Sequence, residues 1–232
     1  VDTVGYLNMR DAGECRPAAA RYWKSYKNRL KIGGYKIFLD GSPQGKTAWL
    51  TQPYTSGPEG FCGYPIYKDE EVKSFARQAL AENAQLLTHC NGDAAAEQLI
   101  SAFAEERAKL SAGHRDDRPV MIHAQTVRPD QLERMAPLGM IPSFFIAHIY
   151  YWGDVHLTNL GRNRAQRISP AGSAEKLDMV YTFHQDSPVL PPNMLDTISC
   201  AVNRRTRAGE LLGAEEQITP WEALKAVTIN AA

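Results

Sequence analysis

A unit of one short apolar strand followed by one helix recurs along this chain, and this recurrence constrains the fold most strongly. QLLTH at 85–89 precedes a helical segment at about 94–109. PVMIH at 119–123 precedes another helical segment at about 129–137. Strands that alternate with helices form a parallel sheet with the helices packed outside it. The sequence therefore predicts an α/β fold.

The other elements follow from periodicity, caps and turn residues. We expect further strands at 35–39, 140–146 and 179–183, with a weaker candidate at 1–7. We expect further helices at 16–31, 69–83, 193–208 and 220–230. Asp93 is expected to cap the helix after it, and Gly139 to end the next one. Long loops, here 42–67 and 147–172, are often functional. No linker divides the chain, so one domain over 1–232 is expected.

Composition and charge exclude several classes of partner. Lys plus Arg and Asp plus Glu both number 26, so the net charge is zero. A balanced chain does not favour nucleic acid or a membrane surface through bulk charge. No apolar run approaches the roughly 20 residues that span a bilayer, and VDTVGYLNMR is not a signal peptide. The four cysteines, Cys15, Cys62, Cys90 and Cys200, form no CxxC pair. Free thiols and a cytoplasmic location are the expectation.

Four expected strands carry a residue able to bind a metal ion: Lys36, His89, His123 and Asp186. Parallel strands bring their carboxyl ends to one rim, and His with carboxylate suits zinc or a similar divalent ion. Each residue alone has a simpler explanation. A single strand-end His is more often structural, and Lys36 at a strand end could extend its ammonium into water. Four such residues at corresponding places favour a metal site.

The segments YKIFLDGSPQGKTAWL, THCNGDAA, RPVMIHAQTV and FHQDSPVLPPN, in this order, resemble the amidohydrolase superfamily. Within it they are similar to amidohydrolase family 3, the branch of N-substituted formamide deformylase-like and YtcJ-like proteins. The resemblance covers nearly the whole chain. It implies a (β/α)8 TIM-barrel-type, metal-dependent hydrolase. The reaction would be hydrolysis of a non-peptide carbon–nitrogen bond in a small-molecule amide, with metal-activated water as nucleophile.

The resemblance also implies a role for each strand-end residue. Lys36 would be carbamylated and bridge two metal ions, and His89 and His123 would bind the second of them. Asp186 would bind the first and accept the proton of the attacking water, as the catalytic residue. From their places near strand ends, His148, His184 and Trp152 are candidate substrate contacts, with structural roles left open. Asp40, Gln44 and Arg162 are weaker pocket candidates. Surface or loop positions are expected for His114 and His156, and a solvated helix face for Arg204 and Arg205.

The chain departs from the family pattern in two places. The family has a His-x-His pair on its first barrel strand, and this sequence has no His before His89. The family also has a small β-sandwich, and this sequence stops at AVTINAA. We therefore expect a fragment: a partial barrel of about the third to eighth strands, without the β-sandwich. The open edges of such a barrel would need cover, for which a homo-oligomer is one candidate.

Two other functions stay open at this point. The chain could be a non-catalytic relative with a binding or regulatory role, which the absent His-x-His pair favours if the chain is complete. It could also be a metal-free α/β protein whose strand-end residues coincide by chance. A fragment of the hydrolase could itself be inactive alone.

Overall fold

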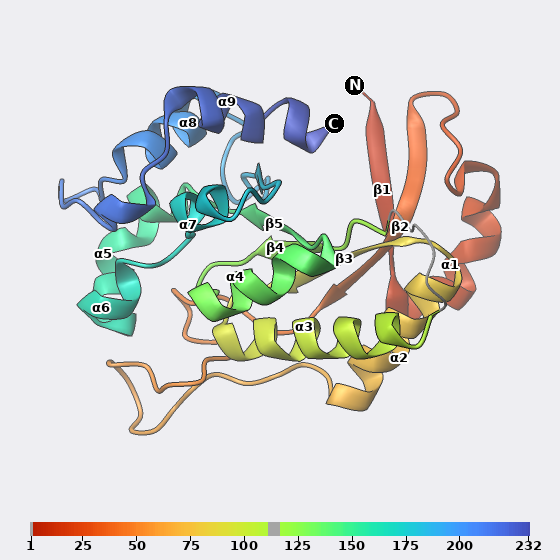
Figure 1. Ribbon diagram of the computed structural model, residues 1–232, viewed down its shortest axis with the longest axis horizontal. Helices are drawn as coiled ribbons and strands as arrows, with labels where there is room; N and C mark the ends of the chain where they lie inside the picture. The colour runs from red at the N-terminus through yellow and green to blue at the C-terminus, as the bar shows by residue number, and fades with distance from the viewer. Residues whose placement is uncertain (1, 111–116) are drawn as a thin grey trace.

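In the described part of the chain, six parallel strands form one sheet whose spatial order follows the sequence, β1-β2-β3-β4-β5-β6. The structure, a computed structural model, describes residues 2–110 and 117–232, so His114 lies outside the described residues. The curved sheet forms half of a barrel (Figure 1), which confirms the predicted α/β partial barrel. The strands are β1 Thr3–Asn8, β2 Leu30–Phe38, β3 Gln85–Cys90, β4 Val120–His123, β5 Ile141–Phe144 and β6 Thr182–Phe183.

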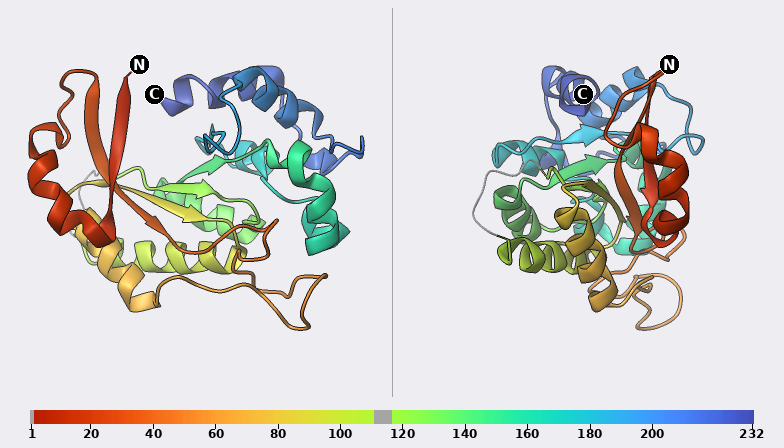
Figure 2. Two further views of the ribbon diagram at one scale, coloured as in Figure 1. Left: turned by 180° about the vertical axis from the view of Figure 1, so that it is seen from behind. Right: turned by 90° about the vertical axis from the view of Figure 1, so that its right-hand side faces the viewer.

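Helices cover the outer side of this half-barrel (Figure 2). Helices α2, α3 and α4 pack side by side there, while α9 contacts β6 at the other end of the sheet. The α-helices are α1 Ala12–Ala19, α2 Asp69–Ala81, α3 Asp93–Ala108, α4 Pro129–Met135, α5 His148–Leu160, α6 Arg162–Ala165, α7 Ala171–Lys176, α8 Met194–Asn203 and α9 Pro220–Ala226. The predicted end at Gly139 is confirmed, since this residue is left-handed with φ 61°. The side chain of Thr219 caps α9.

Strand β2 shows how the two faces of the sheet differ. Tyr35, Ile37 and Leu39 are fully buried beneath the helices. Lys36 and Phe38 alternate with them and therefore lie on the inner face, where Phe38 is 44% exposed. Lys36 pairs with Leu87 of β3 and stands two residues before the end of β2. It does not lie at the head of a strand, because β2 begins at Leu30.

The predicted helix at 16–31 is wrong over most of its length. Helix α1 ends at Ala19 and a 3-10 turn follows to Tyr22, with Pro17 already inside α1. Lys24, Asn28 and Arg29 have positive φ angles, which a right-handed helix does not allow. The chain instead turns back into β2.

The expected strand at 140–146 is shorter, and the segment after it is helical. Strand β5 ends at Phe144, and His148 is the first residue of α5 rather than the end of a strand. The expected loop at 147–172 contains α5, α6 and the start of α7. The expected strand at 179–183 is reduced to Thr182–Phe183.

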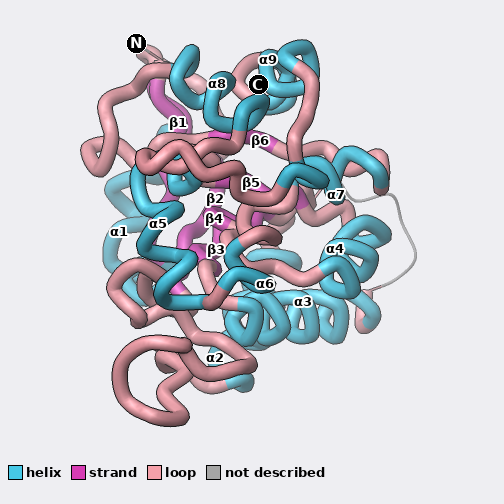
Figure 3. Tube along the Cα trace, turned by 90° about the vertical axis from the view of Figure 1, so that its left-hand side faces the viewer, coloured by secondary structure: helices cyan, strands magenta, loops and turns pink. Residues whose placement is uncertain are grey.

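The long connection between β2 and α2, the large pink loop in Figure 3, is tied to α5 and α6. The Asn159 side-chain amide donates to the carbonyl oxygens of Pro43 and Gln44, at 3.2 and 3.3 Å. The guanidinium of Arg164 donates to Gln52 and Pro53 carbonyls. These contacts hold the loop across the carboxyl end of the sheet.

None of the helices in the described part of the chain is long and apolar enough to cross a membrane. The cytoplasmic location and the homo-oligomer that would cover the sheet edges remain predictions.

Candidate metal centre

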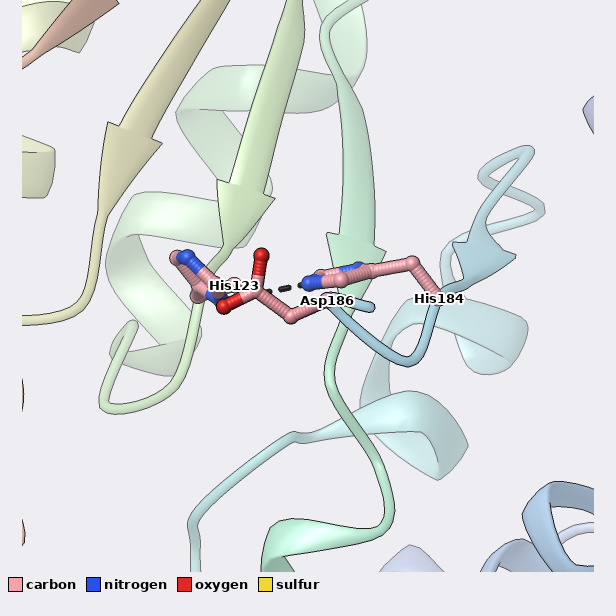
Figure 4. Close-up of side chains that lie close together, drawn as sticks. All are labelled: His123, His184 and Asp186. Carbon is pink, nitrogen blue, oxygen red and sulfur yellow. Dashed lines mark hydrogen bonds between the residues drawn. The ribbon is translucent and has the colours of Figure 1, made fainter. Parts of the chain in front are cut away.

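Three histidines from separate strands meet at the carboxyl rim of the half-barrel. Nε2 of His123 lies 3.0 Å from Nδ1 of His89, and Nδ1 of His123 lies 3.1 Å from Nε2 of His184. Asp186 lies beside them (Figure 4). One possible ligand atom from each of His123, His184 and Asp186 lies within 4.8 Å of the other two. The structure therefore brings together three of the four predicted metal ligands, His89, His123 and Asp186, with His184 added to the set.

The backbone places His123 in this row against the strand alternation. Ile122 pairs with His89 across β3 and β4, so His89 and Ile122 share the inner face and His123 would point outward. His123 instead has φ 74°, and Ala124 follows with φ 44°. Asp186 is also left-handed, with φ 51°. Residues other than glycine rarely adopt these angles, and functional sites are where such strain collects.

Hydrogen-bonding contacts join the three rings into one row. Nε2 of His89 lies 3.0 Å from the Gly41 carbonyl oxygen, an acceptor, and 3.1 Å from the Asn91 side-chain nitrogen, a donor. Its Nδ1 faces Nε2 of His123. At the other end of the row, Nδ1 of His184 lies 3.1 Å from the Ser143 hydroxyl. A divalent metal binds a neutral imidazole through an unprotonated ring nitrogen, so a bound ion would replace a contact of this row.

Burial keeps these rings neutral. It lowers the pKa of His184 to about 3, and it lowers the pKa of His123 well below its ordinary value. The pKa of His89 is also lowered, again mainly by burial. Neutral imidazoles with a carboxylate beside them are donors that fit zinc or a similar ion.

Lys36 is the fourth predicted ligand, and its charge interacts with Asp186 and with the three histidines of the row. Burial lowers its pKa to about 8, while the carboxylate of Asp186 acts in the opposite direction. Its Nζ lies 5.2 Å from the Phe38 ring centroid. Because the charge of Lys36 also contributes to the lowered pKa of His89, His123 and His184, it lies within electrostatic range of the cluster.

Asp40 is a structural clamp behind His89. Its carboxylate accepts from the backbone N–H groups of Trp49, Asn91 and Gly92, at 3.0, 2.9 and 2.6 Å. Burial raises its pKa to about 7 even though these hydrogen bonds favour the charged form. The clamp fixes the turn after β3 against the long loop, and so fixes the end of the strand that carries His89.

The predicted substrate contacts are distributed over the same rim. The His148 ring lies 4.6 Å from Phe145 and 4.6 Å from Trp152, centroid to centroid. Phe145 in turn lies 5.4 Å from the His184 ring. His184 is hydrogen-bonded into the histidine row itself, so it is closer to the candidate metal position than a substrate contact requires. The sequence feature that could have indicated this position is that His184 stands two residues before Asp186.

Several weaker expectations are wrong. His156 is not a surface or loop residue but fully buried in α5. Arg204 is fully buried too, and it donates to the carbonyl oxygens of Ile168, Ser169 and Leu212. Asp93 is the first residue of α3 rather than its cap, which is Gly92, and its carboxylate accepts from Thr51. Isolated residue types do not reveal such tertiary partners.

Comparisons with known proteins agree with this fold. The model of the amidohydrolase family matches residues 2–232. The chain is 27% identical over 209 residues to the amidohydrolase-type protein YtcJ of Bacillus subtilis. This match covers 88% of this chain and 38% of YtcJ. It is 25% identical over 228 residues to the N-substituted formamide deformylase of Arthrobacter pascens, covering 98% of this chain and 41% of that enzyme.

Among solved structures, an uncharacterized metal-dependent hydrolase of Pyrococcus furiosus superposes with a TM-score of 0.84 at 26% identity. The match covers all of this chain and 46% of that one. The chain thus spans less than half the length of these relatives. Its fold is that of the α/β-barrel, metal-dependent hydrolases. More narrowly, the chain belongs to the amidohydrolase family.

Proposed function

We propose that this chain supplies the metal-binding rim of a hydrolase that cleaves carbon–nitrogen bonds other than peptide bonds, in a small-molecule amide. The observation that carries the proposal is the histidine row. Imidazoles from β3 and β4 and from just beyond β6 lie at hydrogen-bonding distance from one another, with Asp186 beside them. Family membership, together with the name of the deformylase relative, supports amides as the substrate class.

A divalent ion, zinc by preference, would be held by Lys36, His89, His123 and Asp186. When bound it would supply a polarised carbonyl and a water whose pKa falls to about 7. The imidazoles are kept neutral by burial, and Asp186 is exposed at the rim beside them.

Lys36 fits the carbamylation that we propose for it. The unprotonated amine attacks the carbon of CO2, a nitrogen–carbon bond forms, and the ammonium so formed loses a proton to give a carbamate anion. With a pKa of about 8, a larger share of Lys36 is unprotonated at neutral pH than for an ordinary lysine. The resulting anion would place two further oxygen donors on the inner face.

Asp186 is proposed to move the proton. Its carboxylate takes a proton from the water that attacks the amide carbonyl and delivers it to the leaving nitrogen. The carbon–nitrogen bond then breaks to give a carboxylic acid and an amine. His148, His184 and Trp152 are proposed to line the substrate side of the same rim, where their rings surround Phe145.

The test is hydrolysis of formanilide by the zinc-supplemented protein, measured by release of aniline. Asp186→Asn should lower the rate at least about 100-fold, since positioned proton transfer contributes about 10²–10⁴-fold. Asp178→Asn is the matched control, because Asp178 is also an exposed aspartate with φ near 50°. Equal rates for Asp186→Asn and the wild type would contradict the proposal. Zinc binding without hydrolysis would favour the non-catalytic alternative.

A further inference from the structure

A second pair of histidines lies on α5, outside the candidate metal centre. His148 is 3% exposed and His156 is fully buried. Their rings are stacked at an angle of 12°, and Nδ1 of His148 lies 3.0 Å from Nε2 of His156. Burial lowers the pKa of His156 to about 4 and the pKa of His148 well below its ordinary value. Each ring therefore carries one proton near neutral pH.

The position of these protons follows from the other nitrogen of His156. Its Nδ1 is buried and makes no hydrogen bond with a described residue. A proton on Nδ1 would be a buried donor without an acceptor, and the proton on Nε2 has an acceptor at 3.0 Å. The favoured form of His156 is thus the Nε2–H tautomer. It donates to Nδ1 of His148, which must then carry its own proton on Nε2.

One aromatic ring, that of Phe145, lies between His148 and the histidine row. The bond to His156 is the one hydrogen bond that the His148 ring makes with a described residue, so its Nε2–H remains available. Phe145 contacts both His148 and His184, at centroid distances of 4.6 and 5.4 Å. The ring that carries the available donor is therefore separated from the histidine row by the Phe145 side chain alone among these contacts.

We infer that His156 is a positioning residue that holds His148 as a hydrogen-bond donor, through Nε2–H, for the carbonyl oxygen of the substrate. This rests on the proposed function for the identity of the acceptor, and on the structure for the tautomer. An N–H donor held in place before the reaction complements an oxygen that becomes negative as water attacks. His148 contacts the substrate and His156 acts through it.

The tautomers can be measured without activity. In the ¹⁵N-histidine-labelled protein, long-range ¹H–¹⁵N correlation spectra distinguish Nε2–H, Nδ1–H and charged rings. We expect His148 and His156 both to be neutral with the proton on Nε2. His156→Gln keeps a side-chain N–H donor and should leave His148 in this form. His156→Met removes the donor and should populate the Nδ1–H form of His148.

A proton on Nδ1 of His148 in the wild type overturns the inference, and so does a tautomer that His156→Met leaves unchanged in a folded variant. Should His156→Met fail to fold, the wild-type and His156→Gln spectra still decide. Addition of formanilide should shift the Nε2 signal of His148, and an unmoved signal contradicts the contact. Hydrolysis in the same sample reports on the proposed function separately, because the tautomers of the free protein do not depend on it.

Discussion

At the scale of single residues, two candidate ligands stand at backbone angles that side chains rarely adopt. His123 and Asp186 have φ of 74° and 51°. Such angles cost of the order of 1–3 kcal/mol and persist where the surroundings enforce them. At His123 the consequence is visible, because the ring turns from the helix side of β4 to meet His89 and His184. The rim is thus shaped by local strain as well as by strand order.

His184 provides a test of this arrangement. Its hydrogen bond fixes the ring of His123, and loss of such a contact typically costs about 10–100-fold in metal affinity. We predict that His184→Ala weakens Co²⁺ binding by about that factor, measured by absorption titration. His156→Gln, a histidine substitution outside the row, should leave the affinity within about twofold. A His184→Ala variant that binds Co²⁺ like the wild type would make His184 a substrate contact alone.

At this scale the sequence predicted that His89, His123 and Asp186 lie near one rim, because the ends of parallel strands meet there. It did not predict the backbone angle that turns His123 into the row, since strand alternation alone would point this side chain outward. The partners of His156 and Arg204 could not be predicted, because both depend on side chains or carbonyl groups that only the tertiary fold brings near. The orphan Nδ1 of His156 is likewise a property of packing and leaves no mark on residue order.

At the scale of elements, the connections between strands and helices decide the geometry. Gly92 shows this most directly, because a Cβ on it would lie 1.8 Å from the carbonyl oxygen of Trp49. The turn after β3 and the long loop therefore pack backbone against backbone. The Asp40 carboxylate accepts from the backbone N–H groups of Trp49 and Gly92 and so links the two segments. The position of the β3 end that carries His89 depends on this link.

We predict that Gly92→Ala lowers the free energy of unfolding by about 2–4 kcal/mol, since two backbone segments must separate. Gly13→Ala is the matched control. Nothing lies within 4 Å of a Cβ at Gly13, which is inside α1, so the alanine should stabilise the protein by about 0.5–1 kcal/mol. Urea denaturation followed by circular dichroism measures both. A Gly92→Ala variant as stable as the wild type would contradict the close approach.

The packing of α2 on α3 has a measurable pH dependence. Hydrogen bonds from Arg77 and Lys109 lower the pKa of Glu106 to about 2, from an ordinary value of 4.5. A lowered pKa stabilises the fold above pH 4.5, and this contribution is lost as the pH falls from 4.5 towards 2. Glu106→Gln should therefore cost about 1–2 kcal/mol at pH 7, with the difference from the wild type shrinking below pH 4.5.

Glu105→Gln provides the control for this experiment. Glu105 pairs with Lys73 and Lys109 on the surface, where water screens ion pairs and their net contribution is small. Its substitution should cost less than that of Glu106 at pH 7. A Glu106→Gln penalty that stays constant from pH 7 to pH 3, in denaturation curves, would show that charge is not its source.

The sequence predicted best those helices and strands whose periodicity and capping residues are clear. The helices at α2, α3 and α9 have clear periodicity or caps and were found within a few residues. Helix α5, HIYYWGDVHLTNL, contains a glycine and several aromatic and β-branched residues, so its helical form depends on packing. The basic, alanine-rich segment at 16–31 favoured a helix locally, yet β2 extends back to Leu30 because it pairs with β1.

At the scale of the whole molecule, the six strands of the described residues form a half-barrel, and the proposed metal ligands lie toward its carboxyl rim. The inner face remains open, and Val4 of β1 and Phe38 of β2 are 52% and 44% exposed. Lys36 lies on the same inner face, and its side chain is only partly buried. Family membership and the superposition on a metal-dependent hydrolase describe this architecture, and the histidine row gives it a proposed centre.

The central claim is that this rim binds a metal ion through Lys36, His89, His123 and Asp186. Its most direct test is the metal content of the purified protein, measured by plasma mass spectrometry after expression with zinc and bicarbonate. We predict about one zinc-like ion per chain, lost in Lys36→Ala and in His123→Ala while circular dichroism shows an intact fold. A wild-type protein without bound metal, or folded variants that retain it, would contradict the account.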